Sequence, residues 1–159
     1  CREPVIGVDL YPTFMEMARI KRPKNLKLDG LSFVPCLKDA SASLGREALY
    51  WHFPAYLQGY KPRHGPFRTT PAAAVRMGDW KLIEFFEDGT LELYNLKQDL
   101  GEKNNLAAKM PDKVKELHAS MLKWREGVKA PVPTEKNPKY DPNAKFSPPR
   151  RGKGKQKKK

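Results

Sequence analysis

The last long apolar pattern in the chain predicts an amphipathic helix over residues 111–128. Its apolar positions recur at the three- and four-residue spacing that places side chains on one helical face. These positions are Val114, Leu117, Met121, Trp124 and Val128. Pro111 suits the first turn of a helix, where its missing N–H costs least. We expect the stripe to pack on a sheet, because a sheet with one bare apolar face needs a cover.

Three segments before this helix predict the strands of an antiparallel meander, with Gly-Asp and Asp-Gly pairs in the turns between them. These segments span residues 73–77, 80–86 and 91–95. Leu91 and Leu93 alternate with polar residues, which is typical of a half-buried strand. Residues 46–53 are rich in aromatic side chains and predict one more strand.

The beginning of the chain predicts a helix that starts after Asp9 and ends before Pro23. Its apolar residues share one helical face and are Leu10, Phe14, Met17 and Ala18. Residues 24–43 predict an irregular connection in which Pro35 interrupts regular structure. Residues 54–71 predict a loop without regular structure, and a loop of this length is usually functional or disordered.

The end of the chain predicts a disordered basic tail over residues 131–159, because it has little apolar surface to bury. Much of the formal net charge of +13 lies there, since eight cations and no acidic residue follow Asp141. Such a tail attracts nucleic acid, anionic lipid or sulfated glycan without specificity. No aromatic residue follows Phe146, so the tail offers no platform for base stacking.

The two cysteines, Cys1 and Cys36, make neither a disulfide framework nor a Cys/His metal spacing. Their redox state does not follow from the sequence. No run of 18 apolar residues is present, so we expect no membrane-spanning helix. The chain begins with Cys instead of Met, and we therefore expect a fragment of a longer protein.

Four ordered patterns in the chain resemble motifs of type I sulfatases, of the arylsulfatase and N-acetylgalactosamine-6-sulfatase kind. Residues 8–13 read VDLYPT and residues 29–37 read DGLSFVPCL, like the family's D-x-x-P-T helix and its D-G-x-S-x-x-P-x-L segment. Residues 76–83, RMGDWKLI, resemble the family hairpin, and residues 92–106 match E-L-Y-N-L-x-x-D-x-x-E-x-x-N-L. Trp124 lies where such proteins often carry L-x-x-W. The resemblance covers residues 5–128 in the family's order.

This resemblance implies an α/β fold of the alkaline-phosphatase-like sulfatase type. Most of this chain would form the C-terminal α+β subdomain, a small antiparallel sheet packed by one helix. Residues 1–36 would end the large domain, residues 37–130 would form the subdomain, and residues 131–159 would be the tail. Members of the family are usually exported, so the resemblance implies a periplasmic or secreted protein.

The resemblance also implies that the catalytic residues lie upstream of this chain. Sulfatases use a formylglycine made from the Cys or Ser of a C/S-x-P/A-x-R motif, with a divalent cation, usually calcium. Neither Cys1 nor Cys36 has this spacing, and the chain contains no Asp-Asp pair like the one that binds the metal in the family. We expect calcium in the full-length parent, no catalytic or metal-binding residue in this chain, and no hydrolysis by the chain alone.

What the chain could contribute is recognition of a sulfated small molecule or glycan at the rim of the cleft. The candidate substrate-binding residues are His52, Arg63, His64 and Arg68. A histidine donates to sulfate or sugar oxygens, and a guanidinium offers two parallel N–H groups to an anion. The alternatives are a histidine held by packing and solvated loop charges. Tyr56 and Tyr60 could stack on a sugar or pack the loop.

Three functions remain open from the sequence. The first is the C-terminal part of a sulfatase that requires the missing N-terminal domain. The second is a basic module that binds polyanions, and the third is an inactive structural remnant. Arg76, Asp79 and Lys81 match the family hairpin, and we interpret them as structural, since Gly-Asp is ordinary turn chemistry.

Overall fold

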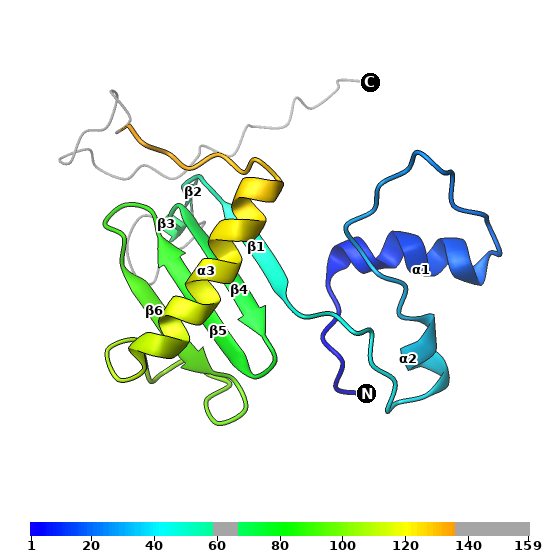
Figure 1. Cartoon of the computed structure of the whole chain (residues 1–159), viewed down its shortest axis with the longest axis horizontal. Helices are drawn as coiled ribbons and strands as arrows, with labels where there is room; N and C mark the ends of the chain where they lie inside the picture. The colour runs from blue at the N-terminus through cyan, green and yellow to red at the C-terminus, as the bar shows by residue number, and fades with distance from the viewer. Residues whose placement is uncertain (59–66, 136–159) are drawn as a thin grey trace, which may run out of the picture. The chain divides into compact units, whose positions relative to one another are not determined.

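The computed structural model describes residues 1–58 and 67–135 of the 159-residue chain. The chain divides into two compact units, Cys1–Glu47 and Ala48–Lys159 (Figure 1). The functional division after residue 36 stays a prediction.

The first unit contains a 3-10 turn and two helices. The turn η1 covers Gly7–Asp9, and it leads into α1, Leu10–Met17. The predicted helix is confirmed. Its side chains Leu10, Phe14 and Met17 are 45%, 60% and 61% exposed.

The second helix of this unit, α2, covers Val34–Lys38 and lies inside the segment predicted to be irregular. That prediction was wrong because Pro35 occupies the first turn of α2, where a proline removes no intrahelical hydrogen bond. From the sequence, Pro35 is expected to interrupt regular structure, whereas it lies at the start of a helix.

The second unit is built on a four-stranded antiparallel sheet in the order β1-β4-β5-β6. The strands are β1 Leu49–Phe53, β4 Ala72–Met77, β5 Trp80–Phe85 and β6 Leu91–Asn95. The turn between β4 and β5 uses Gly78 at φ 56°, which a glycine adopts at little cost. The predicted meander is confirmed, and β1 extends it by pairing with β4.

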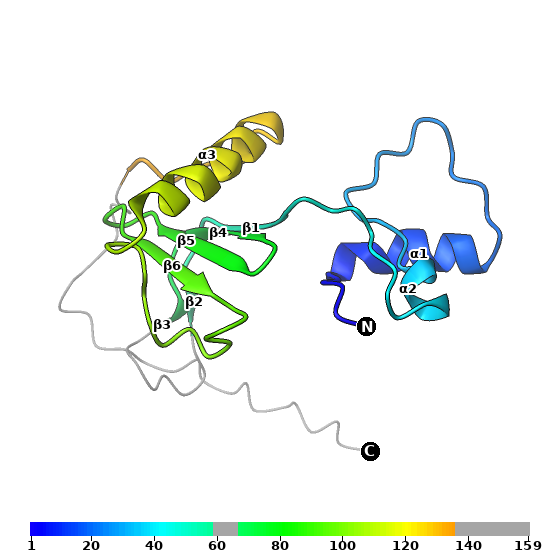
Figure 2. The same cartoon turned by 60° about the horizontal axis from the view of Figure 1, so that its bottom comes forward.

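Helix α3, Pro111–Gly127, covers one face of this sheet (Figure 2). The core between them comprises six buried residues: Ala73, Val75, Leu82, Leu93, Leu117 and Met121. Leu117 and Met121 belong to the predicted stripe, which is confirmed as core packing, whereas Val128 at its end is 52% exposed. Arg125 is also buried, which the sequence pattern did not predict.

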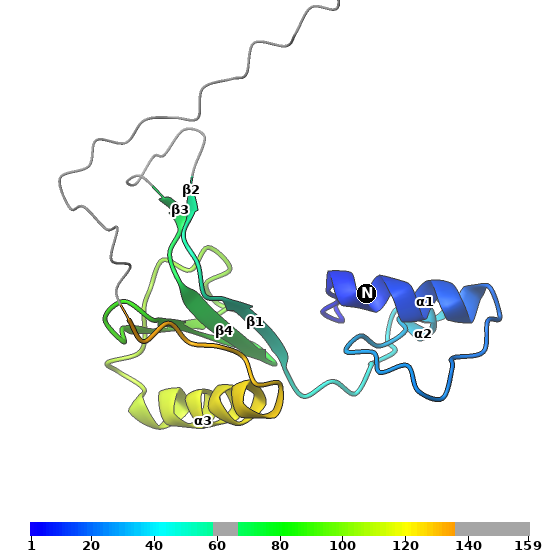
Figure 3. The same ribbon diagram turned by 90° about the horizontal axis from the view of Figure 1, so that it is seen from above.

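A second, two-stranded sheet lies in the segment predicted to lack regular structure. Strands β2, Leu57–Gln58, and β3, Phe67–Thr69, pair antiparallel and project beyond β1 and β4 (Figure 3). The prediction of an irregular loop over residues 54–71 was therefore wrong at residues 57–58 and 67–69, because short paired strands carry little apolar periodicity.

Among the described residues, no helix is long and apolar enough to cross a membrane.

Candidate functional site

His52, the first predicted substrate contact, lies on β1 with its ring in an aromatic cluster. Its ring centroid lies 5.4 Å from that of Phe86 and 6.5 Å from that of Trp124. Nε2 lies 2.7 Å from the carbonyl oxygen of Pro131, so Nε2 carries the proton and donates it to that carbonyl. Nδ1 is buried and has no hydrogen-bond partner among the described residues. These contacts fit a histidine held by packing.

The other three predicted contacts are not brought together with His52 by the described structure. Arg63 and His64 lie outside the described residues. The backbone of Arg68 belongs to β3, and its side chain is not described. A role for these residues in substrate binding stays a prediction.

Of the two tyrosines considered for stacking, Tyr56 is 47% exposed. Its hydroxyl donates to Oε1 of Glu87 at 2.6 Å. That bond links the segment after β1 to the turn after β5. Tyr60 lies outside the described residues.

The residues of the family hairpin make contacts within the second unit. Lys81 Nζ donates to both carboxylate oxygens of Glu102, at 2.8 and 2.7 Å. Arg76 Nε donates to the carbonyl of Gly78 at 3.2 Å, and the carbonyl of Asp79 accepts the N–H of Leu96 at 2.7 Å. The bonds of Lys81 and Asp79 join the β4–β5 hairpin to the segment after β6, and that of Arg76 lies within the hairpin, in accord with the structural interpretation.

The motif over residues 92–106 is likewise explained by backbone capping. Asn95 Oδ1 accepts the N–H groups of Lys97 and Gln98, and Asp99 Oδ2 accepts that of Lys103 at 2.8 Å. Asn105 Oδ1 accepts the N–H of Leu93 at 3.1 Å. Asn and Asp side chains replace backbone acceptors in such turns. The motif therefore specifies a folded connection between β6 and α3.

Tyr94 is a buried titratable residue in this region, and its pKa is raised. It is 7% exposed, and its hydroxyl donates to Oε2 of Glu92 at 2.9 Å. Burial, followed by the hydrogen bond and charge of Glu92, raises the pKa of Tyr94 to about 12. The neutral hydroxyl of Tyr94 acts as a hydrogen-bond donor to Glu92.

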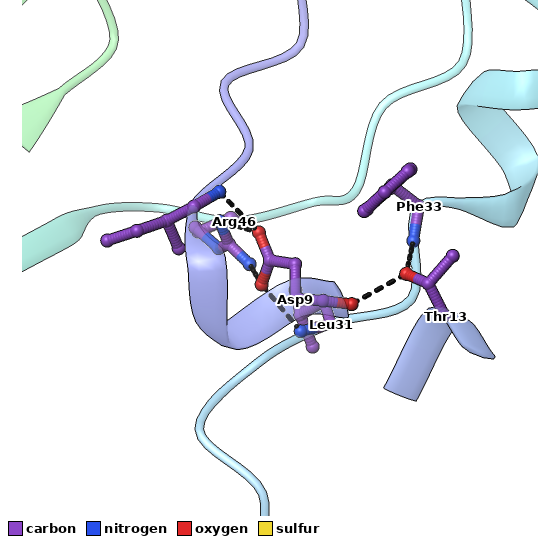
Figure 4. Close-up of polar contacts among 6 residues, drawn as sticks. Asp9, Thr13, Leu31, Phe33 and Arg46 are labelled. Atoms are coloured by element: carbon purple, nitrogen blue, oxygen red, sulfur yellow. Dashed lines mark hydrogen bonds and ion pairs between the residues drawn. The ribbon is translucent and has the colours of Figure 1, made fainter. Parts of the chain in front are cut away.

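Asp9 is the most completely buried charged residue in the described chain, with 0% of its surface exposed. Figure 4 shows the fork of Arg46 facing its carboxylate, with Nη1–Oδ2 at 3.0 Å and Nη2–Oδ1 at 2.5 Å. Its oxygens also accept the N–H of Ile6 at 2.8 Å and of Leu31 at 2.9 Å. A bidentate arginine with backbone donors satisfies a buried carboxylate.

Burial by itself would raise the pKa of Asp9. The hydrogen bond and charge of Arg46, together with the N–H groups of Ile6 and Leu31, outweigh that effect and hold the pKa below its ordinary value. Asp9 is therefore ionised at neutral pH and serves as an anchor for segments 22 and 37 residues further along the chain.

Two neighbours of Asp9 complete this anchor. Thr13 Oγ1 donates to the carbonyl of Asp9 at 2.6 Å and accepts the N–H of Phe33 at 3.1 Å (Figure 4). Gly30 approaches the backbone so closely that an added Cβ would lie 2.0 Å from the carbonyl oxygen of Val8. Asp9, Thr13 and Gly30 belong to the patterns that resemble sulfatases, and their geometry gives them structural roles.

Sequence reasoning did not find Arg46 as the partner of Asp9, because no local signal links residues 37 positions apart. It also missed the cluster of Glu84, His118 and Arg125 beneath α3. Arg125 Nη2 donates to Glu84 Oε2 at 2.6 Å, and its guanidinium lies 5.3 Å from the ring centroid of Phe86. His118 Nε2 lies 3.5 Å from the same carboxylate oxygen.

The described residues do not fit the calcium ion that the family implies. Within residues 1–58 and 67–135, no group of three or more His, Cys, Asp or Glu residues could hold a metal ion. The most buried carboxylate, Asp9, already has all of its partners from the chain itself.

One further pattern bears on the catalytic nucleophile. The spacing S-x-P-x-R, which both cysteines lack, occurs at Ser147, with Pro149 and Arg151. This stretch lies outside the described residues. We assign it no role, but it is a necessary control in any test of activity.

Comparison with known proteins agrees with the fold. Residues 1–127 match the sequence model of the family described as N-sulphoglucosamine sulphohydrolase, C-terminal. A sulfatase from Formosa agariphila is 35% identical over 117 residues, which cover 69% of this chain and 20% of that protein. An N-acetylglucosamine-6-O-sulfatase from Bacteroides thetaiotaomicron is 31% identical over 82% of this chain and 23% of its own length.

Among solved structures, that of BT4656 in complex with its substrate D-glucosamine-2-N,6-O-disulfate superposes with a TM-score of 0.59 and 27% identity. The alignment covers 81% of this chain and 25% of that one. The chain thus spans about a quarter or less of these relatives. The resemblance found in four sequence patterns is confirmed, and the chain belongs to the sulfatase family, in the part that the N-sulphoglucosamine sulphohydrolase C-terminal model describes.

Proposed function

We propose that this chain is the C-terminal part of a sulfatase that hydrolyses sulfate esters of a carbohydrate. The observation that carries the proposal is the match of residues 1–127 to a sulfatase C-terminal family. Two relatives support a sugar substrate: one is described as an N-acetylglucosamine-6-O-sulfatase, and one is bound to a glucosamine disulfate. An aryl sulfate is the second candidate substrate.

In this proposal, the N-terminal sulfatase domain supplies the formylglycine and the calcium ion. Residues 1–36 end that domain, residues 37–130 form the C-terminal subdomain, and residues 131–159 form a basic tail. The chain by itself is inactive, and the parent is secreted or periplasmic.

The contribution of this chain to activity is recognition at the cleft rim. Arg63, His64 and Arg68 follow β1 along the chain, in the connection to β4. Cations there suit the sulfate group, because charge-assisted hydrogen bonds to an anion are short and strong. His52 is the fourth proposed contact, although its Nε2 is already bonded to the carbonyl of Pro131.

The test compares this chain with the full reading frame, using release of inorganic sulfate from glucosamine 6-sulfate and from 4-nitrophenyl sulfate. We expect release by the full-length protein and none by the chain alone. A variant of the chain, Ser147→Ala, controls for the S-x-P-x-R pattern. Sulfate release by the chain alone that disappears in this variant would show that the nucleophile lies here, and the proposal would be wrong.

The alternative is a polyanion-binding module that acts without hydrolysis. The concentration of cations after Asp141 favours it. It predicts that the full reading frame releases no sulfate from either substrate, while the chain still binds polyanions. The third candidate, an inactive remnant, predicts neither activity nor binding.

A further inference from the structure

The loop that follows α1 carries an unusual density of unpaired positive charge. We define the basic loop as residues 19–27, with its five cations Arg19, Lys21, Arg22, Lys24 and Lys27. All five are exposed, and no acidic residue lies between Glu16 and Asp29. Of the ion pairs formed by the described residues, none includes a cation of this loop.

The backbone holds this loop away from both helices of its unit (Figures 1 and 2). The N–H of Arg19 donates to the carbonyl of Glu16 at 3.0 Å, and that of Ile20 donates to Met15 at 2.8 Å. This pair of bonds ends a helix with a left-handed residue, and Arg19 has φ 54°. The position favours glycine, so Arg19 occupies it against the local backbone preference.

A second bend orders the middle of the basic loop. The N–H of Leu26 donates to the carbonyl of Pro23 at 3.1 Å, and Arg22 Nε donates to the carbonyl of Leu26 at 2.7 Å. This bond fixes the guanidinium plane of Arg22 and leaves Nη1 and Nη2 for another acceptor. An arginine fixed in this way presents two parallel N–H groups to the oxygens of a sulfate.

The charges on α3 provide the contrast. Its exposed lysines alternate with Glu116 and Glu126, and Lys113 Nζ lies 2.5 Å from Glu116 Oε2. Cations that have anionic neighbours gain less from an external anion, because their field is already compensated. The positive field of the basic loop has no such compensation within its own sequence.

We propose that the basic loop is a docking surface for a sulfated glycan, which it binds at sulfate groups other than the one being hydrolysed. This inference rests on the proposed function for the identity of the glycan. The loop has no aromatic residue, so it lacks the stacking platform that single-stranded nucleic acid requires. Its arginines and lysines bind anionic groups through their charge, and their spacing along an exposed loop suits an extended polymer.

The test measures binding of a fluorescently labelled heparin oligosaccharide to the full 159-residue chain over a series of sodium chloride concentrations. One variant is Lys21→Gln/Lys24→Gln/Lys27→Gln. The matched control is Lys115→Gln/Lys123→Gln/Lys129→Gln, which removes the same charge from exposed positions of α3 and of the segment after it. Both variants are also made in a chain whose five tail lysines from position 153 onward are changed to Gln.

We expect the loop variant to bind about tenfold more weakly, with a shallower dependence of affinity on salt, because fewer counterions are released. The α3 control should stay within about twofold of the parent chain. Equal losses in the two variants would show that binding follows net charge, and the proposal would be wrong. Undiminished binding of an unsulfated heparosan oligosaccharide, or equal binding of single-stranded DNA, would also overturn it.

This test separates the docking surface from the proposed function. If heparin binding depends on the loop while the full reading frame releases no sulfate, the hydrolytic function fails and the surface stands. If sulfate is released and both variants bind heparin alike, the surface fails and the hydrolytic function stands. Thermal unfolding of each variant, compared with the parent chain, shows that the fold is retained.

Discussion

At the scale of single residues, the buried charged groups of the described structure, Asp9 and Arg125, hold distant segments together. Asp9 binds the backbone of Leu31 and the side chain of Arg46, and Glu84 binds Arg125 across the sheet–helix interface. Such pairs join segments with no local relation in the sequence. A sequence pattern predicts that a residue is charged, but it does not predict which partner compensates the charge.

Replacing Arg46 by Met should destabilise the first unit by about 3 kcal/mol, because Asp9 would remain buried without its main compensating charge. Hydrogen exchange of the Leu31 amide, which donates to Asp9, measures the loss locally. Arg22→Met, at an exposed position of the same unit, is the control and should leave that exchange unchanged. Equal protection of Leu31 in Arg46→Met and the parent chain would contradict the prediction.

The same anchor gives the first unit a defined dependence on pH. The pKa of Asp9 in the folded state lies below its ordinary value of 3.8. Its contribution to stability is therefore complete above that value and is lost as the pH falls through the lower folded pKa. Asp9→Asn removes this part of the pH dependence.

At the scale of elements, long periodic segments could be predicted from the sequence and short ones could not. The strand over residues 91–95 and the helix starting at Pro111 were predicted with the bounds that β6 and α3 show at those ends. Both have apolar positions that repeat over several turns or pleats. Strands β2 and β3 have two and three residues, and such lengths give no period. The pairing of β2 with β3 depends on contacts between two segments that are separated along the chain.

The packing of α3 on β1 depends on an aromatic stack. The rings of Tyr50 and Trp124 lie 4.8 Å apart and are inclined by 4° to each other, and Tyr50 Oη lies 2.8 Å from Ser120 Oγ. His52 also contacts Trp124 through its ring edge. Trp124 was identified by a sequence pattern alone, and the structure gives that pattern a packing role.

Trp124→Ala should lower the free energy of unfolding of the second unit by about 3 kcal/mol, because it removes a large side chain from the helix–sheet interface. A double-mutant cycle with Tyr50→Leu should give a coupling energy of about 1 kcal/mol, as stacked rings do. Leu122→Ala, at an exposed position of α3, is the control. Urea denaturation monitored by circular dichroism measures the four proteins of the cycle and the control, and additive losses in the cycle would contradict the stack.

At the scale of the whole molecule, the family and the fold could be predicted from the sequence, whereas two of the proposed substrate-binding residues lie outside the described residues. Residues of the ordered patterns accept backbone N–H groups, as Asn95 and Asn105 do, or allow a close backbone approach, as Gly30 does. Residues that contact a substrate at the proposed cleft rim need not form such a local sequence pattern. Arg63 and His64 lie outside the described residues, so their role rests on chemistry and position along the chain.

The exposed apolar face of α1 leads to a prediction for the isolated chain. Leu10, Phe14 and Met17 are each 45% or more exposed, and contiguous apolar surface of this kind promotes association. We expect concentration-dependent self-association of the chain by size-exclusion chromatography with light scattering. Phe14→Lys/Met17→Lys should reduce it, while Leu122→Lys on α3 should not. A parent chain that is monodisperse at every concentration would contradict this expectation.

The pairing of Phe53 with Ala72 brings the two ends of the connection between β1 and β4 side by side in the main sheet. The entropy of closing a loop grows slowly with its length, by about 0.6 kcal/mol for each doubling. The connection can therefore be lengthened, shortened or exchanged without moving the core beneath α3. This junction is a natural point for grafting the corresponding segment of another sulfatase, so that the proposed role of the connection in substrate recognition can be tested while the scaffold is kept.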